Sequence, residues 1–323
     1  MKPEALREAL RTYLLRRLEA LPEQEGYRTL LQDYPKRGGK ALRGLLTLYS
    51  ALAHGVALER ALPAAAALEL FQNWVLIHDD IEDGSLERRG GPALHHKYPM
   101  PLALNAGDAL HAEMWGMLLS EEEKVLEEFY ELVRRTAFGQ HLDLSWTLSG
   151  RLITPGEYLE MVRYKAAYYT AVAPLRLGAL LAGRTPPEVY RQGGEALGVA
   201  FQIVDDLLNL TASPAYGKEK AGDLWEGKRT LILAYFLEEA TPEEKERTLR
   251  LLGLPRSQKR AEEVEWLYGR ILQSRALDRA RREAERLKEE GLSLLEPALA
   301  SLPDLEAAQA LLGVLSTLVE RQA

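Results

Sequence analysis

Two carboxylates at a four-residue spacing are the first residues in this chain that suggest chemistry. Asp79 and Asp83 end the apolar run that starts at Phe71, and on a helix they would lie one turn apart on one face. The apolar neighbours indicate partial burial, and a buried carboxylate is costly unless a cation accompanies it. Oxygen ligands with room for water favour a hard ion such as magnesium. For this motif alone, a solvated acidic helix end is an equally good interpretation.

A second acidic cluster repeats the pattern later in the chain. Asp205 and Asn209 have the same four-residue spacing, again at the end of an apolar run. Cations follow both clusters: Arg88 and Arg89 after the first, Lys218 and Lys228 after the second. Two acidic clusters, each followed by cations, suit a site that holds several magnesium ions against a polyphosphate.

Shorter motifs accompany the two clusters in a fixed order. They are Gly38-Gly39-Lys40-x-x-Arg43, His78-Asp79-Asp80-Ile81-x-Asp83 with Arg88-Arg89-Gly90, Asn105-x-Gly107-Asp108, Gly139-Gln140-x-x-Asp143, Lys165, Phe201-Gln202-Ile203-x-Asp205-Asp206 and Glu226-Gly227-Lys228-x-Thr230. With this ordered set the sequence resembles the trans-isoprenyl diphosphate synthases, the polyprenyl synthetases that include farnesyl and geranylgeranyl diphosphate synthases. The resemblance covers Gly38 to Thr230.

Composition narrows the class of protein. The 323 residues are 46% hydrophobic, which is ample for a large core, and length alone permits one or two domains. The net charge of −7 argues against a nucleic-acid surface. The chain contains no cysteine, which fits a cytoplasmic location. The longest stretch without Asp, Glu, Lys or Arg, Gly44 to Leu58, is too short for a membrane span, and no signal peptide is expected.

Helix signals dominate the chain. Thr154 and Thr241 each begin a capping box with proline at the first helical position. Pro63 is expected to open the helix of the first cluster and Gly84 to close it. No run shows the pattern of a β-hairpin. These signals predict one all-α domain over residues 1–323, a helical bundle around a central cavity. Among the expected helices are 4–20, 105–119, 124–148 and 231–239, with others beginning near residues 40, 155 and 186.

The resemblance divides the polar residues between two diphosphate substrates. Lys40 and Arg43 are three residues apart after two glycines, so at a helix start they could grip a diphosphate. From the residues alone, a basic helix start on the surface is the competing interpretation. The resemblance implies that isopentenyl diphosphate is bound by Gly39, Lys40, Arg43, Gln72 and Arg89. It implies that the allylic diphosphate is bound by Arg88, Lys165, Gln202, Lys218 and Lys228.

The implied reaction is head-to-tail prenyl transfer. Carbon–oxygen cleavage in the allylic diphosphate leaves a carbocation, which the double bond of isopentenyl diphosphate attacks. Several magnesium ions, bound by Asp79, Asp83 and Asp205, are expected to stabilise the leaving diphosphate. The released diphosphate is the expected proton acceptor. The expected catalytic residues are Asp79, Asp83, Asp205, Lys165 and Lys228.

Other residues are expected to act indirectly, and some depart from the family pattern. Asp80, Asp206 and Asn209 are expected to act through water or to orient the ligands, and Gln140 and Asp143 to support the fold. An arginine is usual at Ala41, a proline at Gly44, a threonine at Ala166 and an aspartate at Asn209. These departures bear on affinity more than on activity.

Product length is expected to depend on residues just upstream of the first cluster. The resemblance places Trp74 and Val75 there, five and four residues before Asp79. A large residue at the farther position and a small one at the nearer position are typical of geranylgeranyl diphosphate synthases. A farnesyl or longer-chain polyprenyl diphosphate synthase is the alternative.

Two other functions compete with this interpretation. A class I terpene cyclase would share the fold and the first motif, but its usual second motif is absent and the isopentenyl-binding residues are present. A non-catalytic partner subunit of a prenyl synthase would often lack one cluster or its cations, whereas Asp79, Asp83, Asp205 and Lys228 are intact. The family also implies a homodimer.

Overall fold

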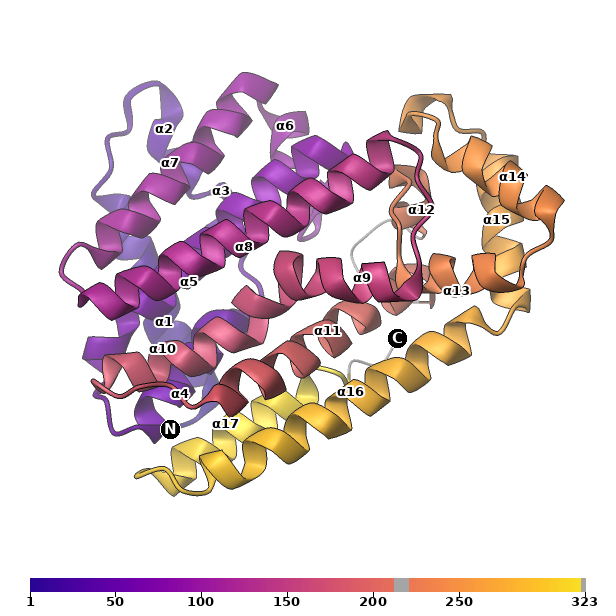
Figure 1. Ribbon diagram of the computed structural model, residues 1–323. Helices are drawn as coiled ribbons and strands as arrows, with labels where there is room; N and C mark the ends of the chain where they lie inside the picture. The colour runs from indigo at the N-terminus through magenta and orange to yellow at the C-terminus, as the bar shows by residue number, and fades with distance from the viewer. Residues whose placement is uncertain (212–220, 321–323) are drawn as a thin grey trace.

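The chain folds into helices that run along one another, and the predicted all-α class is confirmed (Figure 1). The computed structural model describes residues 1–211 and 221–320. The elements up to the second cluster are α1 (Pro3–Glu19), η1 (Gln24–Gly26), α2 (Tyr27–Leu31), α3 (Asp33–Arg37), α4 (Leu42–Ala53), α5 (Leu58–Asp83), β1 (Glu87–Arg88), β2 (Gly91–Pro92), α6 (Leu94–Lys97), α7 (Met100–Leu118), α8 (Glu123–Leu148), α9 (Pro155–Val162), η2 (Arg163–Val172), α10 (Ala173–Leu181) and α11 (Glu188–Thr211). The later elements are α12 (Gly222–Glu226), α13 (Leu231–Glu239), α14 (Pro242–Leu252), η4 (Arg256–Gln258), α15 (Ala261–Gln273), α16 (Ala276–Leu299) and α17 (Leu305–Thr317).

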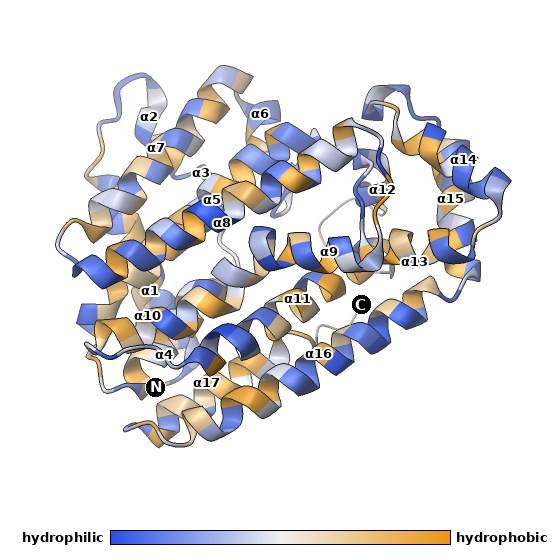
Figure 2. Ribbon diagram, in the orientation of Figure 1, coloured by the Kyte–Doolittle hydropathy of each residue, from blue (hydrophilic) through white to orange (hydrophobic). Residues whose placement is uncertain are grey.

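Helices α5 and α11, which carry the two acidic clusters, are the framework of the bundle. α5 packs against α4 and α7, and α11 packs against η2 and along α16. Figure 2 shows polar and apolar residues alternating around α16, whose apolar stripe buries Leu287, Leu295 and Leu299. Burial of such a stripe is the main favourable contribution to helix packing. α14 and α15 form a separate lobe beside α12 and α13, at the right of Figure 1.

Several predicted helix ends are confirmed, and one is wrong. The capping boxes at Thr154 and Thr241 are both formed. Gly84 ends α5 in the left-handed conformation, with φ of 65°. However, Pro63 does not open α5, because the helix begins at Leu58 and Pro63 lies inside it. Pro63 cannot donate the backbone hydrogen bond that another residue would make at this position, yet α5 continues through it.

The segment η2 is a π-helix within one continuous helical stretch from α9 to α10. Three glycines allow the neighbouring helices to approach its backbone. A Cβ at Gly139 of α8 would lie 2.2 Å from the backbone nitrogen of Lys165, and one at Gly198 of α11 would lie 2.6 Å from Cα of Ala167. Gly194 makes a similar approach to Val172. π-Helical turns are frequent at functional sites, and this one carries Lys165.

A two-stranded hairpin follows α5, although no run of the sequence shows a hairpin pattern. β1 and β2 pair antiparallel, and they are the only strands in the described ranges. Arg89 and Gly90 at the turn have φ of 53° and 72°, as expected for a type I′ turn. Nη1 of Arg37 donates to the carbonyl oxygens of Arg88, at 2.9 Å, and Pro92, at 2.8 Å, so the hairpin is fixed to α3.

None of the helices described here is both long enough and apolar enough to cross a membrane.

Candidate active site

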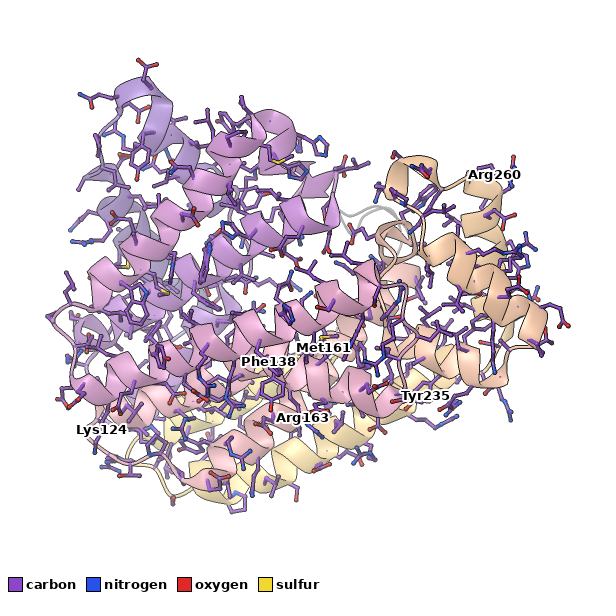
Figure 3. All side chains as sticks on the ribbon, turned by 45° about the horizontal axis from the view of Figure 1, so that its top comes forward. Lys124, Phe138, Met161, Arg163, Tyr235 and Arg260 are labelled. Carbon is purple, nitrogen blue, oxygen red and sulfur yellow. The ribbon has the colours of Figure 1, made fainter. Side chains whose placement is uncertain are left out.

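A cavity of about 630 Å³ lies between the two cluster-bearing helices. Residues from the segment 39–43, α5, the hairpin, α8, α9, η2, α11 and the segment 223–230 line it. Its polar walls include Asp79, Arg88, Lys165, Asp205 and Lys228. Its apolar walls include Val75, Leu76, Met161, Tyr169 and Phe201, and Figure 3 shows Met161 on α9. The cavity therefore combines a charged region with an apolar one.

Asp79 is the cavity-facing carboxylate of the first cluster. Its Oδ1 lies 3.4 Å from Nζ of Lys165 and accepts a hydrogen bond from Gln140 at 3.2 Å, and its Oδ2 lies 3.9 Å from Arg88. Burial alone would raise the pKa of Asp79, but Lys165, Lys228 and Arg88 lower it well below its usual value. This carboxylate is therefore ionised at neutral pH.

Asp83 lies behind Lys228 and is not among the residues that line the cavity. Nζ of Lys228 lies 2.8 Å from Oδ2 of Asp83 and 2.9 Å from Glu226. Burial raises the pKa of Asp83 to about 7, against the opposing effect of Lys228. The pKa of Lys228 is raised because the effect of Asp83 and Glu226 exceeds that of burial. Glu226 also accepts a 2.9 Å hydrogen bond from the hydroxyl of Ser85.

Asp80 is fully buried and cannot act through bulk water. Tyr34 donates a 2.6 Å hydrogen bond to its Oδ2, and Arg88 binds both carboxylate oxygens. Of the two roles expected for Asp80, the contacts support the orienting one. Asp80 holds the guanidinium of Arg88 beside Asp79.

The second cluster has the same arrangement. Tyr158 donates a 2.6 Å hydrogen bond to Oδ2 of Asp206, and Gln202 donates to Oδ1 at 2.8 Å. Burial raises the pKa of Asp206 to about 6, although these donors oppose the shift. Asp205, the expected metal ligand, lines the cavity. The side chain of Asn209 accepts a 3.1 Å hydrogen bond from the backbone of Asp223, so it holds the start of α12.

Two residues expected only to support the fold are part of the site. Asp143 lines the cavity and forms an ion pair with Lys165, and Gln140 binds both Asp79 and Glu82. Asp143 and Asp79 together raise the pKa of Lys165, against the effect of burial. The Gly139-Gln140-x-x-Asp143 motif could have identified both as site residues, because their spacing places the two side chains on one helix face.

The residues expected to bind isopentenyl diphosphate all line the same cavity, as does Glu69. Arg89 donates from Nη1 to the carbonyl of Tyr34 at 2.8 Å and to Asn73 at 2.9 Å. Arg43 donates to the hydroxyl of Thr170 at 2.9 Å and lies 4.6 Å from the ring of Tyr169. The set is Gly39, Lys40, Arg43, Gln72 and Arg89. Helix α4 begins at Leu42, after Ala41 in the left-handed conformation.

Arg88 and Arg89 point to different partners although they are adjacent. Arg88 binds Asp80 beside the first cluster, whereas Arg89 binds Asn73 beside Gly39. Two separate groups of cations therefore face the cavity, one near the aspartates and one near the start of α4. Of the residues expected at the allylic diphosphate, Lys218 lies outside the described residues.

Trp74, expected to influence product length, does not itself line the cavity. Its ring stacks on His111 of α7 at 3.9 Å between centroids and meets Phe71 edge-on at 5.5 Å. Val75, one residue later, does line the cavity. A helix turns about 100° per residue, so neighbouring side chains face different elements. Trp74 therefore closes the α5–α7 interface behind the wall that Val75 forms.

The carboxylates fit a divalent metal in chemistry, although Asp79 and Asp83 are paired with lysines in this structure. No group of three or more potential ligand side chains is assembled within residues 1–211 and 221–320. Yet Oδ2 of Asp83 is buried without a well-oriented hydrogen-bond donor among these residues, despite the nearby ammonium of Lys228. Hard oxygen donors of this kind suit magnesium or calcium. Asp79, Asp83 and Asp205 are the residues that would hold such ions.

Comparisons with other sequences agree over most of the chain. A family described as polyprenyl synthetase matches residues 24–271. A geranylgeranyl diphosphate synthase from Sulfolobus acidocaldarius is 38% identical over 67% of this chain and 68% of its own. A short chain isoprenyl diphosphate synthase from Methanothermobacter thermautotrophicus is 35% identical over 83% of this chain and 85% of its own.

Solved structures share the whole fold. A polyprenyl synthase from Caulobacter crescentus, complexed with calcium and isoprenyl diphosphate, superposes with a TM-score of 0.88 at 29% identity, over 99% of this chain and 96% of its own. A geranylgeranyl pyrophosphate synthase from Corynebacterium glutamicum, complexed with isoprenyl diphosphate and magnesium, gives 0.86 at 28% identity, over 99% and 98%. This chain is a trans-prenyltransferase of the polyprenyl synthetase family.

Proposed function

We propose that this prenyltransferase condenses isopentenyl diphosphate head-to-tail with an allylic diphosphate and yields geranylgeranyl diphosphate, with magnesium as cofactor. One observation carries the proposal: a single cavity brings both aspartate clusters together with two separate groups of cations. Two anionic substrates can therefore bind at once without sharing the same cations. Relatives named geranylgeranyl diphosphate synthase, at 38% and 37% identity, support this product.

The allylic diphosphate would lie beside the aspartates. Arg88, Lys165 and Lys228 carry positive charge there and would stabilise the negative charge that develops on the leaving group. Magnesium ions bound by Asp79, Asp83 and Asp205 would supply further positive charge to the diphosphate oxygens. Gln140 and Asp143 would hold Asp79 and Lys165 in position.

Isopentenyl diphosphate would bind at the other group of cations. Lys40, Arg43 and Arg89 would neutralise its diphosphate. Gln72 lines the cavity as well, and its buried Oε1 has no hydrogen-bond donor among the described residues. The double bond of isopentenyl diphosphate would attack the carbocation. The apolar walls near Val75, Tyr169 and Phe201 would keep water away from that carbocation. The proton lost afterwards would pass to the released diphosphate, as the family resemblance implies.

Product length would be limited by Val75 in the wall and by the stack of Trp74 on His111 behind it. A growing prenyl chain that passes Val75 would meet this stack. Nε1 of Trp115 donates a 3.0 Å hydrogen bond to Nε2 of His111 and so fixes the imidazole. Other relatives are named geranylfarnesyl diphosphate synthases, so a longer product is the main alternative within this class.

The proposal includes a single-domain, cytoplasmic homodimer. Large apolar side chains are exposed on α7 and α8: Leu102, Leu104, Tyr130 and Phe138 are 45–61% exposed. Exposed apolar side chains on these two helices support a subunit interface there. Sedimentation or light scattering of the purified chain would give the mass, and a strictly monomeric protein would contradict this part of the proposal.

Product analysis tests the reaction. The protein is incubated with magnesium, labelled isopentenyl diphosphate and each of dimethylallyl, geranyl and farnesyl diphosphate, and the dephosphorylated products are sized. Geranylgeraniol as the main product supports the proposal. A different single length keeps the reaction and changes the limit on product length. If no starter is elongated, the non-catalytic subunit becomes the better interpretation. Cyclised hydrocarbon from one allylic substrate would instead indicate a terpene cyclase.

A further inference from the structure

Lys259 connects the α14–α15 lobe to the segment that carries Lys228. It follows η4 and precedes α15, and only 7% of the residue is exposed. Its Nζ donates to two main-chain carbonyls of α12, that of Leu224 at 3.0 Å and that of Trp225 at 2.7 Å. Both partners are backbone carbonyls rather than carboxylates, so the contact fixes the backbone of α12.

The end of α12 needs such a donor. The helix has five residues, so its last carbonyls have no donor from a following helical turn. Gly227 stops the helix in the left-handed conformation, with φ of 77°, and its N–H returns to the carbonyl of Asp223. A cation at a helix C-terminus is favourable because it meets both the orphan carbonyls and the negative end of the helix dipole.

Residues from outside α12 enclose the Gly227 turn. A Cβ on Gly227 would lie 2.9 Å from the carbonyl oxygen of Leu252 in α14 and 3.1 Å from Nζ of Lys259. Nη1 of Arg229 would lie 3.6 Å from the same Cβ, and Arg229, which is 1% exposed, donates from Nε to the carbonyl of Arg151 at 3.0 Å. The turn therefore has no room to shift toward the lobe.

The residues on either side of this turn act in the site. Glu226 and Lys228 flank Gly227, and the ammonium of Lys228 bridges Glu226 and Asp83. A displacement of the α12 end would move Lys228 and Glu226 relative to Asp83, which lies on α5. Burial, with Arg229 and Arg256 nearby, lowers the pKa of Lys259 to about 8. Keeping this ammonium inside is therefore costly, and its two carbonyl bonds must offset the cost.

We propose that Lys259 is a positioning residue: by capping α12 it fixes Lys228 at the diphosphate-binding end of the cavity, and the α14–α15 lobe is the support from which it acts. The inference deepens the proposed function, on which it rests for the assignment of Lys228 to the allylic diphosphate. The lobe is visible around the labelled Arg260, the residue next to Lys259, in Figure 3.

Steady-state kinetics on two variants test the proposal. Lys259→Met keeps the side-chain length but leaves the two carbonyls without their donor. We expect KM for the allylic diphosphate to rise about tenfold and kcat to fall, as when an outer partner of a ligand is lost. KM for isopentenyl diphosphate should stay unchanged, because its cations lie at the start of α4 and on the hairpin. Lys259→Gln retains a donor and should be less impaired.

Arg247→Met is the matched control in the same lobe. Arg247 pairs with Glu263 at 2.9 Å and lies 3.9 Å from the ring of Trp266, on the helices α14 and α15. This variant removes a cation from the lobe without altering the cap of α12, so its kinetic constants should match the wild type. An equal rise in KM in both variants would mean that lobe stability, not the cap, is responsible.

Hydrogen exchange provides a readout that needs neither metal nor turnover. Amides in residues 222–228 should exchange faster in Lys259→Met than in the wild type, and Arg247→Met should leave them unchanged. Unchanged exchange and unchanged KM for the allylic substrate in Lys259→Met would overturn the inference. If the wild type itself elongates no starter, the proposed function fails, while the exchange result still decides whether Lys259 caps α12.

Discussion

The hydroxyl of Tyr158 donates a 2.6 Å hydrogen bond to Oδ2 of Asp206. Tyr34 has the same relationship, at the same distance, with Asp80. In each cluster a tyrosine from a different helix holds the second aspartate, while the first aspartate lines the cavity. The repeated motif in the sequence thus corresponds to a repeated arrangement in space.

Tyr158→Phe should lower kcat/KM by about 10- to 100-fold, the usual cost of removing the partner of a site carboxylate. Without the phenol, Asp206 keeps Gln202 as its donor and loses the bond that fixes its Oδ2. Steady-state kinetics at saturating magnesium would measure the effect. The control is Tyr190→Phe, which removes a buried hydroxyl 3.2 Å from His54 and away from the cavity lining. Equal losses in both variants would contradict the prediction.

Gly139→Ala should displace the π-helix and with it Lys165. The added methyl group would lie 2.2 Å from the backbone nitrogen of Lys165, and overpacking of this kind costs about 1–3 kcal/mol. We expect lower stability in urea denaturation and a lower kcat. Gly313→Ala, on a helix where a Cβ would meet nothing within 4 Å, should instead gain about 0.5–1 kcal/mol. If Gly139→Ala matches that gain, α8 does not constrain Lys165.

Substitutions at Trp74 and Val75 should change product length in opposite directions. Val75→Phe places a larger side chain in the cavity wall, so shorter products should accumulate. Trp74→Ala removes the ring stacked on His111 and opens space behind that wall, so products longer than those of the wild type should appear. Sizing the dephosphorylated products measures both effects. An unchanged product from Trp74→Ala would show that the stack is not the limit.

Magnesium binding should strengthen as the pH rises through about 7. Asp83 has a pKa of about 7 in the metal-free protein, so below that pH its proton must leave when a metal ligates it. Calorimetry with magnesium alone, in buffers of different ionisation enthalpy, should show proton release at pH 6 that vanishes by pH 8.5. Asp83→Asn should abolish this release.

Lys259 should make stability rise with pH in alkaline solution. Its pKa is about 8 in the folded protein and 10.5 as an ordinary lysine, so between these values the unfolded chain binds more protons. The free energy of unfolding must then increase with pH, by up to about 3 kcal/mol. Urea denaturation at pH 7.5 and 10 should show a larger gain in the wild type than in Lys259→Met. Other groups titrate in both proteins and cancel in the difference. Equal gains in the two proteins would mean that the Lys259 ammonium is exposed to water.

The sequence predicted which residues belong to the site, but not which of them form pairs. The chain order of motifs predicted Asp79, Lys165 and Lys228 as members of one site, and all three line one cavity. The pairing itself was not predictable: Lys165 meets Asp143 and Asp79, while Lys228 meets Asp83 and Glu226. Each pair joins helices whose relative position depends on packing.

Trp74 is a residue whose side-chain direction the sequence could not predict. Its position five residues before Asp79 suggested a side chain in the cavity, but on α5 it faces α7. Gly107 of α7 lies so close that an added Cβ would be 3.3 Å from the Trp74 ring. Sequence spacing gives the face of one helix, and only the neighbouring helix decides whether that face meets a cavity or a packed interface.

The sequence by itself determined the features that depend on a few consecutive residues. The capping boxes at Thr154 and Thr241, the end of α5 at Gly84 and the one-turn spacing of Asp79 and Asp83 follow from local backbone geometry and hydrogen bonding. The tertiary structure decided the contacts between distant residues. Tyr158 and Asp206 are 48 residues apart, and Lys259 and Leu224 are 35 apart. Such contacts form only when burial of apolar surface has fixed how the helices pack, and that packing is a property of the whole chain.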